Sequence, residues 1–270
     1  MVAFDNDGTL WVEQPIYVMI RFAADRMKAL APSHPEWNTN PKFKAVIDGG
    51  QDAILSLEPK DQFAVGFAVH AGMTTDEYRA GVVEWLATHR HPRFARPYTD
   101  LAYAPMLELI AYLRANSFQI YSSTGAELDF VRVVNEKSFG IGPTHVLATL
   151  LGTRFNEGAG RPSIDALPDL KFLNDGDGKP LGLHNTLGRR PIAAFGNSDG
   201  DLAMLEWTAG GGGVRLMALI HHDDAEREYA YDRTSPVGKL DKALDAANSR
   251  KWTVVSMKRD WKDVFASPTK

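Results

Sequence analysis

The chain has 270 residues, of which 44% are hydrophobic and 24% charged, with a formal net charge of −4 and no cysteine. This length and balance are typical of a globular protein with one large domain, or with a core domain and a smaller accessory one. The lack of cysteine excludes disulfides and cysteine nucleophiles, and the lack of a basic run or of an apolar stretch of about 20 residues argues against nucleic-acid and membrane partners.

An apolar segment opens the chain and a helical region follows it. Residues 2–4 are typical of the end of a buried strand, which runs into the polar turn at residues 5–9. From residue 15 to about residue 96 the apolar residues recur with helical spacing and prolines interrupt them, which predicts an insertion of short helices. The residues expected on apolar helix faces there are Ile16, Ile20, Ala23 and Met27 in one helix and Tyr78, Val82, Trp85 and Leu86 in another.

The rest of the chain alternates between helices and strands. Helices are expected at 106–115, 130–137 and from 202, and strands at 118–123, 191–195, 215–220 and 252–255. Between residues 147 and 183 the pattern indicates short β segments separated by glycine-rich turns. Such alternation predicts βαβ units, and therefore an α/β fold with a doubly wound, mostly parallel sheet.

Polar clusters follow three of the expected strands, at residues 5–9, 122–125 and 196–201. In an open parallel sheet, ligands bind beyond the carboxyl ends of the strands. We therefore expect these distant clusters to meet at one edge of the sheet and to form a single site.

The first cluster has the residues needed for phosphoryl transfer. The Asp5 carboxylate can attack phosphorus and form an aspartyl-phosphate, provided that a hard cation such as Mg²⁺ screens the charge. Asp7 lies close enough to protonate the leaving oxygen and later to deprotonate water. Gly8 permits a tight turn beside the substrate and Thr9 can fasten it. A plain surface turn would use the same residue types, but these acids directly follow an apolar strand.

The segment from Phe4 to Leu10 resembles the Asp-x-Asp-Gly-Thr signature of the haloacid dehalogenase-like (HAD) superfamily, and specifically its phosphatase branch, since the dehalogenases lack the second acid. The nearest resemblance is to phosphoserine-phosphatase-like and bacterial acid-phosphatase-like members. It implies a Mg²⁺-dependent phosphomonoester hydrolase that acts through an aspartyl-phosphate. It also implies a Rossmann-like catalytic core at residues 1–14 and 97–270 and a helical cap domain at residues 15–96.

The same resemblance assigns roles in the other two clusters. Thr124 and the Gly125 amide would hold phosphoryl oxygens, with Ser123 as the alternative if the register is shifted by one. Asn197 and Asp201 would hold Mg²⁺, directly or through water, together with Asp5 and the backbone carbonyl of Asp7. Asn197 stands where the commonest form of the motif has Asp, so the metal site has one charge fewer.

A lysine is also implied before the third cluster, where it would hold the nucleophile and the phosphate. The best register places Asn185 at this point. Lys179 is the nearest lysine and is taken as the catalytic cation, while Arg189 and Arg190 are alternatives. A missing cation would weaken the stabilisation of the transition state.

Other interpretations remain open from the sequence. A non-catalytic phosphate-binding protein on the same fold would suit Asn197 and a missing lysine, and a phosphotransferase is a third interpretation. The expected partner is a small phosphorylated substrate. The identity of this substrate and the oligomeric state of the protein stay open. Arginines 21, 26, 79 and 93 are candidate anion contacts, and the histidines at 221 and 222 are expected to have structural or surface roles. The chain as written is expected to be cytoplasmic, or periplasmic if an N-terminal leader is missing.

Overall fold

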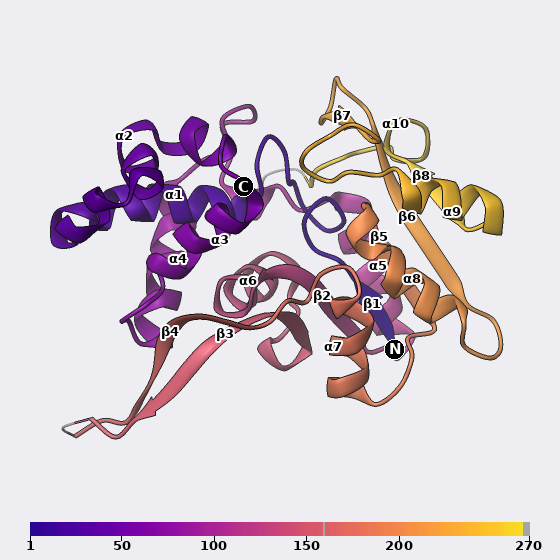
Figure 1. The fold of residues 1–270 in the computed structure, drawn as a ribbon. Helices are drawn as coiled ribbons and strands as arrows, with labels where there is room; N and C mark the ends of the chain where they lie inside the picture. The colour runs from indigo at the N-terminus through magenta and orange to yellow at the C-terminus, as the bar shows by residue number, and fades with distance from the viewer. Residues whose placement is uncertain (159, 267–270) are drawn as a thin grey trace.

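The computed structural model describes residues 1–158 and 160–266, and its centre is a twisted sheet with the strand order β4-β3-β2-β1-β5-β6-β7, in which β8 also pairs with β6 (Figure 1). The pairs that join β1, β2, β3, β5, β6 and β8 are parallel, and only β4 and β7 pair in the antiparallel sense. The strands are β1 (Val2–Phe4), β2 (Ile120–Glu127), β3 (Val146–Asn156), β4 (Ser163–Phe172), β5 (Ala193–Gly196), β6 (Leu216–Asp223), β7 (Ala230–Tyr231) and β8 (Thr253–Ser256).

Helices cover both faces of this sheet. The α-helices are α1 (Val18–Leu30), α2 (Pro41–Leu55), α3 (Pro59–Ala68), α4 (Thr75–Thr88), α5 (Ala104–Ala115), α6 (Leu128–Val134), α7 (Gly178–Leu187), α8 (Leu202–Ala209), α9 (Lys242–Arg250) and α10 (Met257–Asp260). Short 3₁₀ turns lie at Ala31–Ser33, Pro35–Thr39, Tyr98–Asp100, Pro143–His145 and Asp199–Asp201, and a π turn at Asn135–Phe139.

The strands bury alternate residues in two separate apolar layers, as the period of two along a strand requires. Val2 and Phe4 pack into the layer that contains residues of α5 and α6, whereas Ala3 packs into the layer that contains residues of α7, α8 and α9. Both faces of β1 are therefore covered. The predicted doubly wound α/β fold with a mostly parallel sheet is confirmed.

The region from residue 18 to residue 88 is helical, as predicted, and contains α1 to α4. Ile16, Ile20, Ala23 and Met27 are all buried in an apolar cluster of this region, which is separate from the two layers of the sheet. The second predicted apolar face, on α4, is also buried but not in this cluster. It packs onto the layer of the sheet that contains α6. We keep the division into a core (1–14 and 97–270) and a cap (15–96) as a proposal.

The hairpin of β3 and β4 extends from the sheet toward the helical region (Figure 1). The backbone N–H of Ala166 donates to the carbonyl oxygen of Met73 at 2.9 Å, and the N–H of Gly72 donates to the carbonyl oxygen of Ala166 at 3.2 Å. The hairpin thus holds the loop between α3 and α4 by backbone hydrogen bonds.

One sequence-based expectation is wrong here. Residues 178–183, expected in a β excursion, form the first turns of α7. The glycines of this segment suggested turns, but Gly178 and Gly182 are buried in tight contacts where a Cβ would meet the Leu173 carbonyl oxygen and the Asn174 side chain. The glycines therefore allow α7 to pack closely, and this packing places Lys179 inside the protein.

Across residues 1–158 and 160–266, none of the helices combines the length and the apolar character that crossing a bilayer requires.

Candidate active site

Asp5 directly follows β1, the strand that lies between β2 and β5 at the centre of the sheet. The Asp5 N–H donates to the carbonyl oxygen of Phe195 in β5 at 2.9 Å, and the Ser122 hydroxyl of β2 donates to the Asn6 side-chain oxygen at 2.7 Å. The loop after β1 is thus tied to both neighbouring strands. The carboxylate of Asp5 is 5% exposed and faces the cavity described below.

The turn after Asp5 requires glycine at position 8. Gly8 has a φ of +74°, and a Cβ there would overlap the Asn197 amide nitrogen and the Glu13 carboxyl group. An L side chain would therefore meet both a backbone penalty and a steric one. Asp7 precedes this turn, and its Oδ1 accepts a hydrogen bond from the indole N–H of Trp11 at 2.9 Å.

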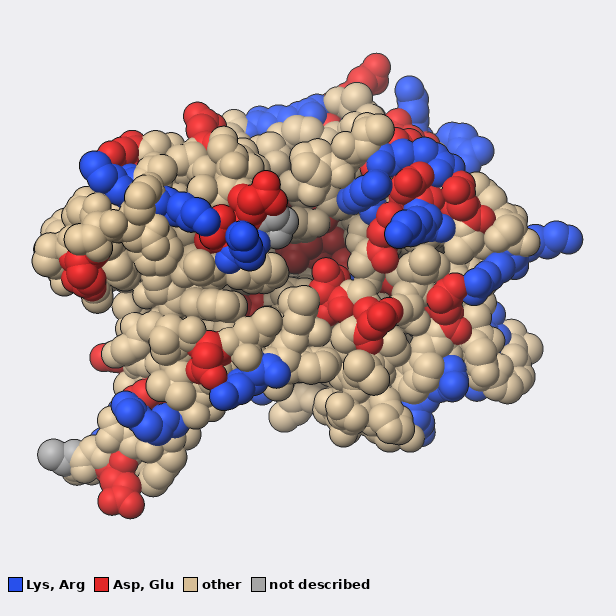
Figure 2. Space-filling view, viewed as in Figure 1, with Lys and Arg blue, Asp and Glu red and all other residues tan. Residues whose placement is uncertain are grey.

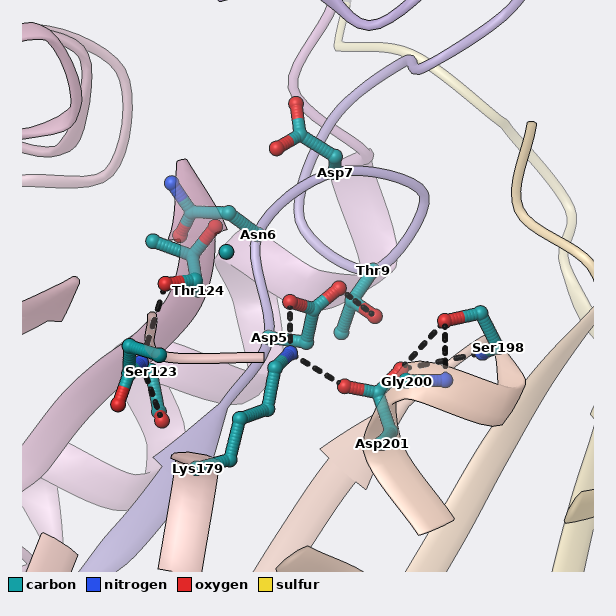
Figure 3. Close-up of polar contacts among 12 residues, drawn as sticks. Asp5, Asn6, Asp7, Thr9, Ser123, Thr124, Lys179, Ser198, Gly200 and Asp201 are labelled. Carbon is teal, nitrogen blue, oxygen red and sulfur yellow. Dashed lines mark hydrogen bonds and ion pairs between the residues drawn. The ribbon is translucent and has the colours of Figure 1, made fainter. Parts of the chain in front are cut away.

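Lys179 reaches the site from the first turn of α7 (Figure 3). Its Nζ lies 2.5 Å from Oδ1 of Asp5 and 2.6 Å from Oδ1 of Asp201, and the residue is only 2% exposed. The register that places Asn185 at the cation position is wrong, because Asn185 is exposed on the same helix. The cation that contacts Asp5 is the predicted one, Lys179.

The two arginines considered as alternatives do not reach Asp5. Arg189 donates to Gln119 at 3.0 Å, and Arg190 donates to the carbonyl oxygen of Trp207 and lies over the Trp207 ring. Both arginines are exposed.

Burial and the two acids around Lys179 determine the charges of this group. Burial, and then the charge of Asp201, raise the pKa of Asp5 to about 8, while Lys179 acts in the opposite direction. Burial opposes the charge of Lys179, but Asp201 and Asp5 outweigh it and hold the Lys179 pKa above its ordinary value. One ammonium group thus faces two buried carboxylates. When all three groups are ionised, the group has one negative charge in excess, which favours a cation nearby.

The third cluster lies against the first. The Thr9 hydroxyl is 3.0 Å from Oδ1 of Asn197 and 3.3 Å from Oδ2 of Asp5, so it contacts both oxygens. The amide nitrogen of Asn197 donates in turn to Oε1 of Glu13 at 2.6 Å. This contact orients the Asn197 amide so that its oxygen faces the Asp5 side.

Asp201 lies in the site but is fully engaged by protein donors. Its Oδ1 accepts from Lys179, and its Oδ2 accepts from the backbone N–H groups of Asn197 at 2.9 Å and Ser198 at 3.0 Å. A Cβ on Gly196 would clash with it. Asp201 therefore positions Lys179 and the Asn197 loop, and its metal role, direct or through water, stays a prediction.

The oxygen atoms around Thr9 are suitable ligands for a hard divalent cation. Oδ2 of Asp5 and Oδ1 of Asn197 are oxygen ligands of the kind that Mg²⁺ prefers, and the excess negative charge present when Asp5, Asp201 and Lys179 are all ionised favours its binding. The Asp7 carbonyl remains a predicted third ligand. Burial raises the pKa of the Asp7 carboxyl to about 6, so a fraction of this group holds a proton near neutral pH.

The second cluster places its threonine in the cavity. Thr124 and Gly125 line it, and the Thr124 oxygen accepts from the Ala126 N–H at 3.2 Å, which leaves the hydroxyl hydrogen able to donate to a ligand. The alternative, Ser123, is fully buried, and its hydroxyl oxygen accepts from the Asn174 side chain at 3.2 Å. Of the two candidate hydroxyls, Thr124 is the one that lines the cavity, and its role in holding phosphate stays a prediction.

Sequence reasoning missed two acids of this site. Glu13 is 1% exposed, accepts from Asn197 and from the Tyr231 hydroxyl at 2.7 Å, and its pKa is well above the ordinary value because of burial. Asp175 lines the cavity beside Gly125. A lone acid in the apolar run of residues 10–13 was a signal for Glu13, whereas Asp175 was hidden in a glycine-rich turn.

A second group of potential metal ligands lies apart from the Asp5 site. His70, Glu127 and Asp129 have ligand atoms within 4.8 Å of one another and are buried. Burial, and secondarily the charge of Arg26, lower the pKa of His70 to about 4. A nearby guanidinium disfavours a cation, so this group fits a metal less well than the oxygens around Thr9.

No family model matches the sequence, and no curated protein matches it. Solved structures do match. A protein of unknown function from Bordetella pertussis Tohama I is 14% identical, with a TM-score of 0.59 and coverage of 94% of this chain and 97% of that chain. A conserved protein of unknown function from Anaerococcus prevotii DSM 20548 is 13% identical, with a TM-score of 0.61 and coverage of 95% and 84%. At such identities the likeness shows a shared fold.

A phosphoserine phosphohydrolase-like protein from Francisella tularensis subsp. tularensis SCHU S4 also matches, with 13% identity, a TM-score of 0.45 and coverage of 94% of both chains. The fold class itself is established by the sheet order and the two helical layers.

Proposed function

We propose that this chain is a phosphatase of the HAD superfamily, a Mg²⁺-dependent phosphomonoester hydrolase that uses Asp5 as its nucleophile. The observation that carries the proposal is the position of the Asp5 carboxylate. It lies at the carboxyl end of the central strand, 2.5 Å from the Lys179 ammonium, and one hydroxyl bridges it to the Asn197 loop. Three clusters that are distant in sequence support one reaction at this point.

In the first half of the reaction, an oxygen of Asp5 attacks phosphorus as the bond between phosphorus and the ester oxygen breaks. Asp7 gives its proton to the departing oxygen, so that the alcohol leaves neutral. Lys179 and the Thr124 hydroxyl hold the charged oxygens of the transferring group. The product on the protein is an aspartyl-phosphate at Asp5.

In the second half, the Asp7 carboxylate takes a proton from water while the water oxygen attacks phosphorus. The bond between phosphorus and Asp5 breaks, which releases inorganic phosphate and restores both carboxyl groups. Mg²⁺, held by Asp5, Asn197 and the Asp7 carbonyl, would neutralise charge on the phosphoryl oxygens. Asp201 acts through Lys179 and its own loop.

Turnover of p-nitrophenyl phosphate with Mg²⁺ tests this proposal. The native chain should release p-nitrophenol, and Asp5→Asn should reduce kcat by at least about 1000-fold because the amide is a far weaker nucleophile. Asp48→Asn, an exposed acid in α2, is the matched control and should leave the rate unchanged. Equal rates for the native chain and Asp5→Asn would reject the mechanism.

The alternative of a non-catalytic phosphate-binding protein loses one of its two supports, since a lysine contacts Asp5. The uncharged Asn197 is its remaining support. A phosphotransferase would be recognised in the same assay by product that retains the phosphoryl group when an acceptor alcohol is added. The helical region at residues 15–96 is proposed as a cap that limits access of bulk water to Asp5.

A further inference from the structure

The cavity at Asp5 is much larger than a phosphate group needs. It has a volume of about 470 Å³, within the range of about 300 to 1,000 Å³ that is common for small-molecule pockets. Asp5, Thr124 and Lys179 line its phosphate end. The remaining space lies between the core and the helical region, where a leaving group would be held.

The wall of this space is largely apolar. Leu55 at the end of α2 and Leu173 are 41% and 40% exposed, so both side chains are accessible to a ligand. Both line the cavity. The apolar side chains that form the wall from the helical region are Ile16, Met19, Ile20, Leu55, Leu57 and Phe63.

The charged residues of the lining are nearly all acidic. Among the described residues that line the cavity, Lys179 is the single basic one, and its ammonium lies at the phosphate end, where it contacts Asp5 and Asp201. Glu13 and Asp175 add carboxylates to those of Asp5 and Asp7. Figure 2 shows acidic side chains deep in the hollow of this face.

The arginines considered as anion contacts are used elsewhere. Arg21 donates to Gln51 at 3.0 Å, Arg26 to the Val69 carbonyl oxygen at 3.4 Å, and Arg93 to the Ala225 carbonyl oxygen at 2.7 Å. Arg79 pairs with Asp76 on the surface of α4. None of the four lines the cavity as described. A second anionic group on a substrate would therefore be desolvated without a cationic partner.

We propose that the substrate is a phosphomonoester of an apolar alcohol that carries no negative charge outside the phosphate. This inference rests on the proposed phosphatase function and specifies its leaving group. Apolar contact with the leaving-group wall supplies affinity, and an ester that carries a carboxylate or a second phosphate would lose hydration there without meeting a cationic partner.

The first test compares substrates of matched size and opposite charge. Phosphoethanolamine and phosphoglycolate differ mainly in an ammonium and a carboxylate group, and n-hexyl phosphate adds an apolar chain. We expect kcat/KM to be highest for n-hexyl phosphate and lowest for phosphoglycolate, with at least about a 100-fold range. A kcat/KM for phosphoglycolate equal to or above that for either other ester would overturn the proposal.

The second test changes the wall. Leu55→Arg places a guanidinium beside the leaving group at a position that is already partly exposed, so the fold should tolerate it. It should raise the kcat/KM ratio of phosphoglycolate to n-hexyl phosphate by about tenfold or more. The matched control is Val83→Arg, on α4 and 39% exposed but outside the cavity lining, which should leave the ratio unchanged. An equal ratio in the native chain and in both variants contradicts the proposal.

The two proposals fail in different ways. If no ester is hydrolysed in an Asp5-dependent manner, the phosphatase function itself is wrong. If hydrolysis depends on Asp5 but favours the anionic ester, only the assignment of the leaving group is wrong.

Discussion

The Nε2 atom of His222 lies 2.7 Å from the carbonyl oxygen of Gly8, so a histidine at the end of β6 donates to the turn that carries the two candidate catalytic acids. Its Nδ1 is 3.1 Å from Glu228, and the histidine is 2% exposed. The neighbouring His221 contacts Asp232 at 3.5 Å nearer the surface. The expectation of structural or surface roles agrees with this geometry, and His222 supports the turn at residues 5–9.

We therefore predict that His222→Ala lowers kcat about tenfold and unfolding stability by about 1 to 3 kcal/mol, because a buried carbonyl loses its donor. His222→Gln, whose amide can donate to the same carbonyl, should recover part of the loss. Steady-state kinetics and thermal unfolding measure both effects. His221→Ala is the control, and an equal loss in that variant would show that the contact with Gly8 is unimportant.

Removal of the lysine between Asp5 and Asp201 gives a second prediction. Lys179→Met leaves two buried carboxylates without their shared cation, so kcat should fall about 100- to 1000-fold. Stability should fall as well, and the deficit should grow as the pH rises from about 5 to about 9. The sign follows because burial raises the folded-state pKa of Asp5 above its unfolded value, so the stability that protonated Asp5 contributes is lost as the group ionises.

The exposed pair of Lys171 and Asp169 provides the control for this variant. Lys171→Met removes the same charge from the surface and should change both kcat and stability little. A loss of stability in Lys179→Met that is independent of pH would contradict the electrostatic explanation.

The three strand ends could be predicted from the sequence because each is an apolar run that stops at a polar cluster, and a parallel sheet brings such ends together. The position of Lys179 could not be predicted in the same way. Its segment has glycines before and after it, which suggested turns rather than a helix. The contact between Glu13 and Asn197 joins residues that are 184 positions apart. It depends on how their side chains pack in three dimensions, which cannot be predicted from local sequence patterns.

A third prediction concerns stability and pH away from Asp5. Burial, and then Asp129, raise the pKa of Glu127 to about 8. The folded-state pKa lies above the unfolded one, so the stability from this group is fully present below about pH 4.5 and is lost as the pH rises toward 8. The loss should amount to a few kcal/mol.

Glu127→Gln should flatten this part of the stability curve, because the amide does not ionise and can still accept one of the two helix-capping hydrogen bonds. Chemical denaturation between about pH 5 and about pH 8, in the presence of a chelator, measures the effect. The exposed Glu136 supplies the control Glu136→Gln. Parallel curves for the native chain and Glu127→Gln would show that Glu127 ionises without cost.

The identity of residue 197 leads to the last prediction. Oε1 of Glu13 lies 2.6 Å from Nδ2 of Asn197, so this position must provide a hydrogen-bond donor to a buried carboxyl group. Aspartate, the residue in the commonest form of the motif, would place two carboxyl groups in direct contact. Asn197 thus supplies a hydrogen-bond donor to Glu13, whose pKa burial holds well above its ordinary value.

Asn197→Asp alone should raise the half-saturating Mg²⁺ concentration for hydrolysis by about tenfold and should lower stability, because two carboxyl groups then meet in a buried site without the donor that Asn197 supplies. Glu13→Gln alone should also weaken Mg²⁺ binding. The new amide can turn either its oxygen or its nitrogen toward Asn197, so it no longer fixes the orientation of the Asn197 oxygen. The double variant should recover much of the affinity, because the new amide at position 13 can donate to the new carboxylate at position 197. The coupling energy from this cycle should exceed about 1 kcal/mol. Glu108→Gln, an exposed acid in α5, is the single-site control, and strictly additive effects of the two substitutions would show that Glu13 and Asn197 act independently.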